Sequence, residues 1–270
     1  MRQRNRWNSL ALAMLLLGMM AALWAKQVSV SGKGAIFGSV SVKTVPNQPI
    51  VIGCVGDSIT YGYLSSGGQA NPNPCAGMAA DLNSMTGTSL YSAFDVGVIG
   101  SFSANWITTC SSCLPGGGGN INSGLTGLSP TRFTPGMVAT GVSVVQIMIG
   151  TNDAQTPVSQ STYQSNLTNI IGAIKAAGIN KIVLHYQPYI NTNLGGWTIS
   201  TSDPALLTYQ TAMQNVAAAD PTHVLMGDTT AYAWFQANPS YQADGVHPTS
   251  AGYLVLAQRW ATALYTDLGL

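Results

Sequence analysis

The sequence predicts an α/β protein with a central parallel sheet that is covered by helices on both faces. From residue 50 onwards, short apolar runs alternate with longer amphipathic segments, and this alternation is typical of βαβ units. The most β-branched run, 142–149, is apolar apart from Ser143 and Gln146, as expected for a strand that is largely buried on both faces. Neither an internal repeat nor a second type of composition is visible. We therefore expect one domain over residues 50–270, built as a three-layer α/β/α sandwich.

The first half of this domain contains two predicted strands and one predicted helix. The run 50–55 reads as a buried strand that ends at Gly56, residues 75–86 favour a helix, and 93–99 are strand-like. A stretch rich in Gly, Ser and Asn follows from about residue 101 to 130, which is typical of a loop.

The second half continues the alternation and begins with the strand at 142–149. A helix is predicted over 160–177, because its amphipathic pattern stops at Gly178, a residue that commonly follows helix ends. The remaining predicted elements are a strand at 181–186, a helix at 204–219, a short strand at 224–226, and a helix from about 250 to the C-terminus.

The N-terminus resembles an export signal. Arg2, Arg4 and Arg6 precede an apolar run from Leu10 to Leu23, which small residues follow up to Ala25. This order predicts a secretory signal peptide over residues 1–25 and a secreted or periplasmic protein. The alternative is an uncleaved anchor, but the run is shorter than the roughly 20 apolar residues of a membrane span, so we expect no stable anchor after cleavage. Residues 26–49 are expected to form a linker or a short peripheral hairpin.

The low charge content excludes several functions. Charged residues make up 7% of the chain, against about 25% in typical soluble domains. All nine acidic residues are aspartates, which excludes mechanisms that need a glutamate. The net charge of +1 gives no case for nucleic-acid binding, which normally requires a clustered basic surface. We expect neither a metal site nor a cofactor.

Four cysteines fit an oxidising compartment, but four cysteines allow three pairings and the sequence does not choose among them. Cys54 lies in an apolar strand and Cys75 follows a loop, whereas Cys110 and Cys113 form a CxxC within the Ser/Gly-rich stretch. We favour a disulfide that involves Cys110 and Cys113, with a free, buried Cys54 as a further possibility.

Polar motifs follow the predicted strands. Ser58 lies within Gly-Asp-Ser-Ile-Thr after the first strand, and Asn152 within Gly-Thr-Asn-Asp after the strand at 142–149. Asp244 and His247 lie in Asp-Gly-Val-His-Pro before the last helix. Ligands of parallel α/β sheets bind at the carboxyl ends of the strands, so we expect these residues to meet there. A serine nucleophile needs a base, and the base needs a third group to orient it.

Two other histidines are weaker candidates for that base. His223 begins a predicted strand at the far end of the sheet, and His185 has no aspartate near it in the sequence. His247 has Asp244 three residues before it in the same turn.

These three motifs resemble those of the SGNH hydrolases, also called GDSL-type esterases. The resemblance spans residue 50 to the C-terminus and implies a flavodoxin-like fold. It also implies that Ser58 is the nucleophile, that His247 is the general base, and that Asp244 orients His247. The Ser58 N–H and the Asn152 side chain are implied donors of an oxyanion hole.

The third donor, a glycine N–H, is implied by a motif of the form N-x-G-x-x-G. Two segments offer this spacing, one ending at Gly127 and beginning with Asn122, the other ending at Gly100 and beginning with Asp95. We favour Gly127, with Gly100 as the alternative, because an acetylxylan-esterase-like branch of the family shows a similar order of segments. That branch usually has Glu after the Asn, where this chain has Ser123.

Together with the predicted signal peptide, the resemblance implies a secreted serine ester hydrolase that acts on short-chain acyl (acetyl) esters of polysaccharides or on small-molecule esters. Alternatives are a lipolytic esterase, a thioesterase or an acyltransferase with the same triad, or a carbohydrate-binding protein without catalysis. Eight aromatic residues near the strand ends could contact sugars or acyl chains, or could simply belong to the core: Tyr61, Tyr63, Trp106, Tyr186, Tyr189, Trp197, Tyr232 and Trp234. The sequence leaves the oligomeric state open.

Overall fold

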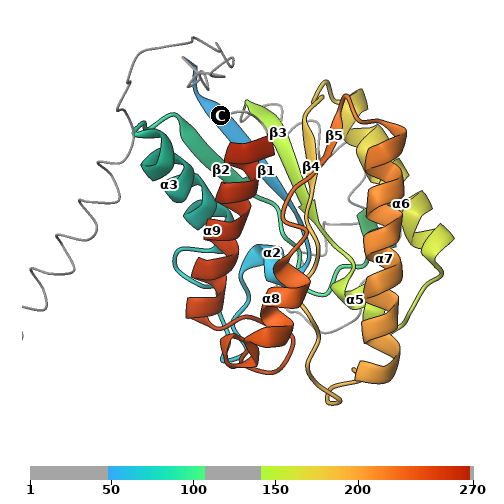
Figure 1. Ribbon diagram of the computed structural model, residues 1–270. Helices are drawn as coiled ribbons and strands as arrows, with labels where there is room; N and C mark the ends of the chain where they lie inside the picture. Colours follow the sequence, from blue (N-terminus) through green and yellow to red (C-terminus); the bar gives the residue numbers. More distant parts are fainter. Residues whose placement is uncertain (1–47, 107–140, 268–270) are drawn as a thin grey trace, which may run out of the picture. The chain divides into compact units, whose positions relative to one another are not determined.

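A computed structural model describes residues 48–106 and 141–267. Within these ranges the chain forms a five-stranded sheet in the order β2-β1-β3-β4-β5, and all neighbouring strands are parallel (Figure 1). The predicted α/β class with a central parallel sheet is confirmed. The predicted signal peptide, Gly127, Cys110 and Cys113 lie outside the described residues. The strands are β1 (Ile50–Gly56), β2 (Tyr91–Asp95), β3 (Val142–Met148), β4 (Ile182–Leu184) and β5 (Val224–Met226).

Helices cover both faces of the sheet. On one face α3 packs against α9, and on the other α6 packs against α7 (Figure 1). Within the described ranges, no helix is both long enough and apolar enough to cross a membrane. The α-helices are α2 (Ser58–Tyr61), α3 (Pro74–Thr86), α5 (Thr151–Gln155), α6 (Gln160–Ala176), α7 (Ile199–Ala219), α8 (Ala231–Ala237) and α9 (Ser250–Asp267), and the 3-10 helices are η1 (Ser103–Trp106) and η3 (Pro239–Tyr241).

Alternate side chains of the central strands enter different halves of the core. Val145 and Ile147 of β3 belong to the apolar cluster that contains α6 and α7. Val144 and Met148 belong to the cluster that contains α3 and α9. Successive side chains of a strand point to opposite faces, so a strand between two helical layers is largely apolar on both faces; in β3 the exceptions are the exposed Ser143 and the buried Gln146. This explains why the predicted strands read as mostly apolar runs.

Local capping signals set the ends of the two best-predicted helices. At the start of α3, the Asn73 side chain accepts a hydrogen bond from the Ala76 N–H, and Pro74 occupies the first turn. Gly87 ends the same helix in the left-handed conformation. At the start of α6, the Ser159 side chain accepts from the Thr162 N–H. Such caps satisfy backbone donors that the helix itself leaves unpaired, and both predicted helices agree with the structure to within one residue.

The second predicted strand is shorter than expected. The prediction placed it at 93–99, whereas β2 spans Tyr91–Asp95. The N–H groups of Val96 and Val98 still donate to the carbonyls of β1, but the chain then passes very close to α2. A Cβ at Gly97 would lie 2.3 Å from the Tyr61 backbone nitrogen, so this approach requires glycine.

The helix predicted at 204–219 begins earlier, at Ile199. Proline is common in the first turn of a helix, and the predicted range begins at Pro204. In the structure Pro204 lies inside α7, and the turn before it is closed by hydrogen bonds from the Thr201 and Ser202 N–H groups to the Thr198 carbonyl.

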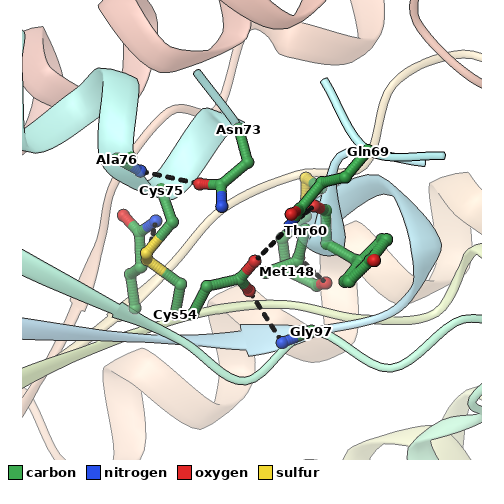
Figure 2. The surroundings of a disulfide bond; sticks show 11 residues. Cys54, Thr60, Gln69, Asn73, Cys75, Ala76, Gly97 and Met148 are labelled. Atoms are coloured by element: carbon green, nitrogen blue, oxygen red, sulfur yellow. Dashed lines mark hydrogen bonds between the residues drawn. A yellow bond between two sulfur atoms is a disulfide. The ribbon is translucent and has the colours of Figure 1, made fainter. Parts of the chain in front are cut away.

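A disulfide joins Cys54 of β1 to Cys75 of α3 (Figure 2). The possibility of a free Cys54 is therefore wrong. The pairing joins cysteines 21 positions apart, and both residues are fully buried in the core on the α3–α9 side. The closed loop contains Ser58, so the covalent link ties the segment that carries this serine to the body of the domain.

Removing this disulfide is expected to destabilise the fold. In chain-entropy terms, a loop of this size restricts the unfolded chain enough to contribute about 3 kcal/mol. We expect the Cys54→Ala/Cys75→Ala double variant to lose about 2–4 kcal/mol in the free energy of unfolding, measured by urea titration of the oxidised protein. Reducing both proteins should remove most of the difference in stability between them, and equal stability of the two oxidised proteins would contradict the expectation.

Candidate active site

The sheet has a topological switch point between β1 and β3. From β1 the chain continues to β2 on one side, while β3 pairs with β1 on the other. In parallel sheets such a point leaves a crevice at the carboxyl ends of the strands, where ligands bind. Ser58 lies two residues after the end of β1, and Asn152 lies four residues after the end of β3. The fold therefore delivers both predicted residues to this crevice.

Asp57 connects these two segments. Its buried carboxylate accepts hydrogen bonds from the Ile59 N–H at 3.0 Å and from the Thr151 N–H at 3.3 Å. Burial raises the pKa of Asp57 to about 6, although both N–H groups and the nearby His247 act in the opposite direction. The residue thus caps the short helix that begins with Ser58 and joins it to the start of α5.

Ser58, His247 and Asp244 form a continuous hydrogen-bonded chain. Ser58 Oγ lies 2.9 Å from His247 Nε2, and His247 Nδ1 lies 2.7 Å from Asp244 Oδ2. The other carboxylate oxygen of Asp244 accepts from the backbone N–H groups of Val246 and His247. The structure brings together the three residues that the sequence analysis selected.

The ionisation of Asp244 fixes the role of each ring nitrogen. Partial burial raises the pKa of Asp244, but hydrogen bonds from His247 and Val246 outweigh this and lower the pKa to about 2. Asp244 is therefore a carboxylate at neutral pH and can only accept hydrogen bonds. His247 Nδ1 must then carry the proton, which leaves Nε2 free to accept from the Ser58 hydroxyl.

The turn that carries His247 depends on glycine. Gly245 has a φ of +81°, and a Cβ there would lie 2.3 Å from the Asn191 carbonyl oxygen. The Asn191 N–H donates to the Gly245 carbonyl at 2.6 Å. The turn between Asp244 and His247 thus packs, backbone against backbone, on the segment that follows β4.

Asn152 faces the segment that follows β2. Its Nδ2 donates to the Ser101 carbonyl at 2.9 Å, and because a carboxamide has two N–H groups, one remains for a ligand. The turn before it is held by Tyr163 and Gln187, whose side chains both donate to the Ile149 carbonyl. These buried contacts fix the start of α5.

Two backbone N–H groups near Ser58 lack partners among the described residues. No hydrogen bond joins the N–H of Ser58 or of Gly100 to another residue in ranges 48–106 and 141–267. Gly100 immediately precedes Ser101, the residue that Asn152 contacts. Gly127, the predicted third donor, lies outside the described residues.

The other two histidines do not contact Ser58 in the described structure. His185 is buried, its Nδ1 accepts from the Asp228 N–H, and burial lowers its pKa to about 4 despite the attraction of Asp228. His223 pairs with Asp220 at 2.7 Å just before β5. The proximity of His185 to Asp228 has no signal in the sequence, because the two residues are 43 positions apart.

The aromatic residues near the strand ends have different environments. Trp106 and Tyr186 are buried in the core. Tyr63 contacts the edge of the His247 ring, with the ring centroids 5.0 Å apart. Tyr63 therefore lies against a residue of the hydrogen-bonded chain that includes Ser58.

Comparison with known proteins identifies the family. The model of the GDSL-like Lipase/Acylhydrolase family matches residues 54–255, a segment that includes Ser58, Asn152, Asp244 and His247. The chain belongs to this family. No curated protein matches the sequence significantly.

Solved structures share the fold at low sequence identity. A lipase/acylhydrolase from Enterococcus faecalis has a TM-score of 0.57 and 20% identity, covering 80% of this chain and 96% of that one. A mutant of an acetyl-xylooligosaccharide esterase from Geobacillus has a TM-score of 0.56 and 20% identity, with 80% and 94% covered. A carbohydrate acetylesterase from Sinorhizobium meliloti has a TM-score of 0.56 and 14% identity, with 80% and 99% covered.

The family assignment makes the chain a carboxylic ester hydrolase. The resemblance stated from the three sequence motifs is thus confirmed at the level of the family.

The buried state of Asp57 predicts a pH dependence of stability. Folding raises its pKa from 3.8 to about 6, so the folded chain holds this proton more tightly than the unfolded chain. The resulting stabilisation is complete below pH 4 and is lost as the pH rises through 6, with a magnitude on the order of 3 kcal/mol. We expect urea titrations between pH 4 and 7 to show a shallower decline for Asp57→Asn than for the wild type.

Part of this decline should remain in the Asp57→Asn variant. Burial also raises the pKa of Asp95 to about 6, and that residue is unchanged. Identical pH slopes for the variant and the wild type would show that Asp57 does not titrate in this window.

Proposed function

We propose that the protein hydrolyses carboxylic esters through an acyl-enzyme on Ser58. The observation that carries this proposal is the unbroken hydrogen-bonded chain from Asp244 through His247 to Ser58. A serine hydroxyl is a weak nucleophile until an adjacent base accepts its proton. Here the base contacts the hydroxyl directly, and an ionised carboxylate orients the base.

The geometry supports the following order of steps. As Ser58 Oγ attacks the ester carbonyl carbon, its proton moves to His247 Nε2, and Asp244 stabilises the imidazolium that forms. When the tetrahedral intermediate collapses, His247 returns the proton to the leaving alcohol. A water molecule then attacks the acyl-enzyme while His247 accepts its proton. Collapse of this second intermediate releases the carboxylic acid, and His247 returns the proton to Ser58.

The negative oxygen of the tetrahedral intermediate needs hydrogen-bond donors in fixed positions. We assign this role to the Ser58 N–H and to the free N–H of the Asn152 carboxamide. The described residues support Gly100 as the third donor, because its N–H has no partner among them and it adjoins the segment that Asn152 contacts. Gly127 stays the sequence-based prediction for the same role.

Short acyl esters of polysaccharides, acetyl esters above all, are the proposed substrates. The support comes from neighbours in fold, which include an acetyl-xylooligosaccharide esterase and a carbohydrate acetylesterase. We also propose that the protein is exported, since residues 1–25 read as a signal peptide and the Cys54–Cys75 disulfide suits an oxidising compartment. A lipolytic esterase is the second candidate, favoured by the lipase/acylhydrolase neighbour.

Chain-length preference separates these candidates. We expect the mature chain to hydrolyse p-nitrophenyl acetate faster than the butyrate or octanoate and to release acetate from acetylated xylan, and we expect Ser58→Ala to lose both activities. A preference for octanoate would indicate lipid substrates and would still be consistent with Ser58 as the nucleophile. Turnover that survives in Ser58→Ala would contradict the proposed mechanism.

Removing the Asn152 amide should slow the chemical step. Loss of one oxyanion donor typically lowers kcat by about 10²–10³-fold. We therefore expect the kcat of Asn152→Ala on p-nitrophenyl acetate to fall by this factor, with KM little changed. Asn83→Ala is the matched control, because Asn83 Nδ2 also donates to a backbone carbonyl, that of Tyr91. The Asn83→Ala variant should lose stability and keep the wild-type kcat. Equal kcat values for Asn83→Ala and Asn152→Ala would argue against Asn152 as an oxyanion donor.

A further inference from the structure

We propose that Asp153 is a positioning residue that holds the Gly100 side of the oxyanion site in register with Asn152. The inference rests on the proposed function, since it concerns the donors assigned there. It goes further by giving a role to the last residue of the Gly-Thr-Asn-Asp motif, which neither the triad nor the oxyanion donors use.

The Asp153 carboxylate binds one residue of the neighbouring segment with both of its oxygens. Asp153 is 1% exposed. One oxygen accepts from the Ser103 N–H at 2.8 Å, and the other accepts from the Ser103 hydroxyl at 2.5 Å. Two hydrogen bonds to one charged group fix distance and orientation together, and such charge-assisted bonds are stronger than neutral ones.

Ser103 is also held from a second helix. Its Oγ accepts a hydrogen bond from Asn166 Nδ2 of α6 at 2.8 Å. Asp153 of α5 and Asn166 of α6 therefore meet at one serine hydroxyl, which donates to the first and accepts from the second. This pairing uses the donor and one acceptor site of the hydroxyl and anchors η1 to two helices.

The anchored segment leads directly back to Gly100. Ser101 presents its carbonyl to Asn152 Nδ2, and its hydroxyl donates to the Gly56 carbonyl at the end of β1. Consecutive side chains of α5 thus contact the same short segment, Asn152 as a donor to Ser101 and Asp153 as an acceptor from Ser103. Together they fix the backbone next to Gly100 relative to the Asn152 carboxamide.

The support behind Asp153 is rigid. The Tyr209 hydroxyl donates to the Asp153 carbonyl at 3.1 Å. The Tyr209 ring stacks on Tyr163 with the centroids 4.1 Å apart, and Tyr163 donates to the carbonyl before the Gly150 turn. An ångström-scale misplacement of catalytic groups can lower the rate by about 10²-fold, so these contacts bear on turnover as well as on stability.

The test compares Asp153→Asn and Ser103→Ala with the wild type. An asparagine presents an N–H where the carboxylate accepted, so at least one Ser103 donor loses its partner. For Asp153→Asn we expect kcat on p-nitrophenyl acetate to fall by about 10²-fold, with KM within about threefold. The Ser103→Ala variant keeps the hydrogen bond from its backbone N–H to Asp153, so its kcat should fall less, by about tenfold.

Asp228→Asn is the matched control. Asp228 is also buried, and it likewise accepts from both the N–H and the hydroxyl of one residue, Thr230, while pairing with Arg259. The Asp228→Asn variant should lose thermal stability but keep the kcat of the folded enzyme. It therefore reports what the loss of a similar buried carboxylate does when the oxyanion site is intact.

Three outcomes are informative. The inference is supported if kcat of folded Asp153→Asn falls while kcat of Asp228→Asn does not. It is overturned if folded Asp153→Asn keeps the wild-type kcat, or if its loss matches that of the control. If Asp153→Asn does not fold, Ser103→Ala decides by the same comparison. Failure of the proposed function itself would appear separately, as wild-type turnover in Ser58→Ala.

Discussion

The parallel pairing of β1 with β3 is the constraint on which the rest of the site depends. Gly56 at the end of β1 pairs with Met148 at the end of β3, so the two strands end at the same level. The loops that follow must then start side by side, and they carry Ser58 and Asn152. Because the apolar side chains of both strands are buried in the two helical layers, a one-residue shift in register would move each of them into the opposite layer and disrupt its packing. The core therefore fixes the separation of these two groups before any polar contact is made.

Most of the aspartates whose side chains the structure describes bind backbone N–H groups. Among the described residues, the aspartates that accept hydrogen bonds from main-chain N–H groups are Asp57, Asp95, Asp153, Asp228 and Asp244. Most are substantially buried, where an unpaired carboxylate would be strongly destabilising. The pKa shifts separate their roles, because burial dominates at Asp57 and raises its pKa, whereas hydrogen bonding dominates at Asp244 and lowers it. A short, low-charge sequence can thus place ionised and readily protonated carboxylates in one domain.

The sequence predicts the parts of this structure that depend on local pattern. Strand order along the chain, the capped helices α3 and α6, and the identity of Ser58, Asn152 and the Asp244–His247 pair follow from periodicity, turn residues and motif spacing. The contacts that depend on distant segments do not. Nothing near Cys54 indicates Cys75 as its partner. Ser103 lies in the Gly-, Ser- and Asn-rich stretch, which has no periodic pattern, so its contact with Asp153, 50 positions away, has no signal in one sequence.

The packing of Gly245 on Asn191 limits how the segment after β4 can be changed in length. The segment after β4 is joined to the catalytic turn through the Asn191–Gly245 backbone hydrogen bond, and to α5 through a hydrogen bond from Gln155 to the Gly195 carbonyl. Inserting or deleting residues in this segment would therefore also shift the backbone near His247 and α5. Between the two attachments, Leu194 is 77% exposed. Side-chain diversity at that position, with loop length held constant, offers variation that leaves the proton relay undisturbed.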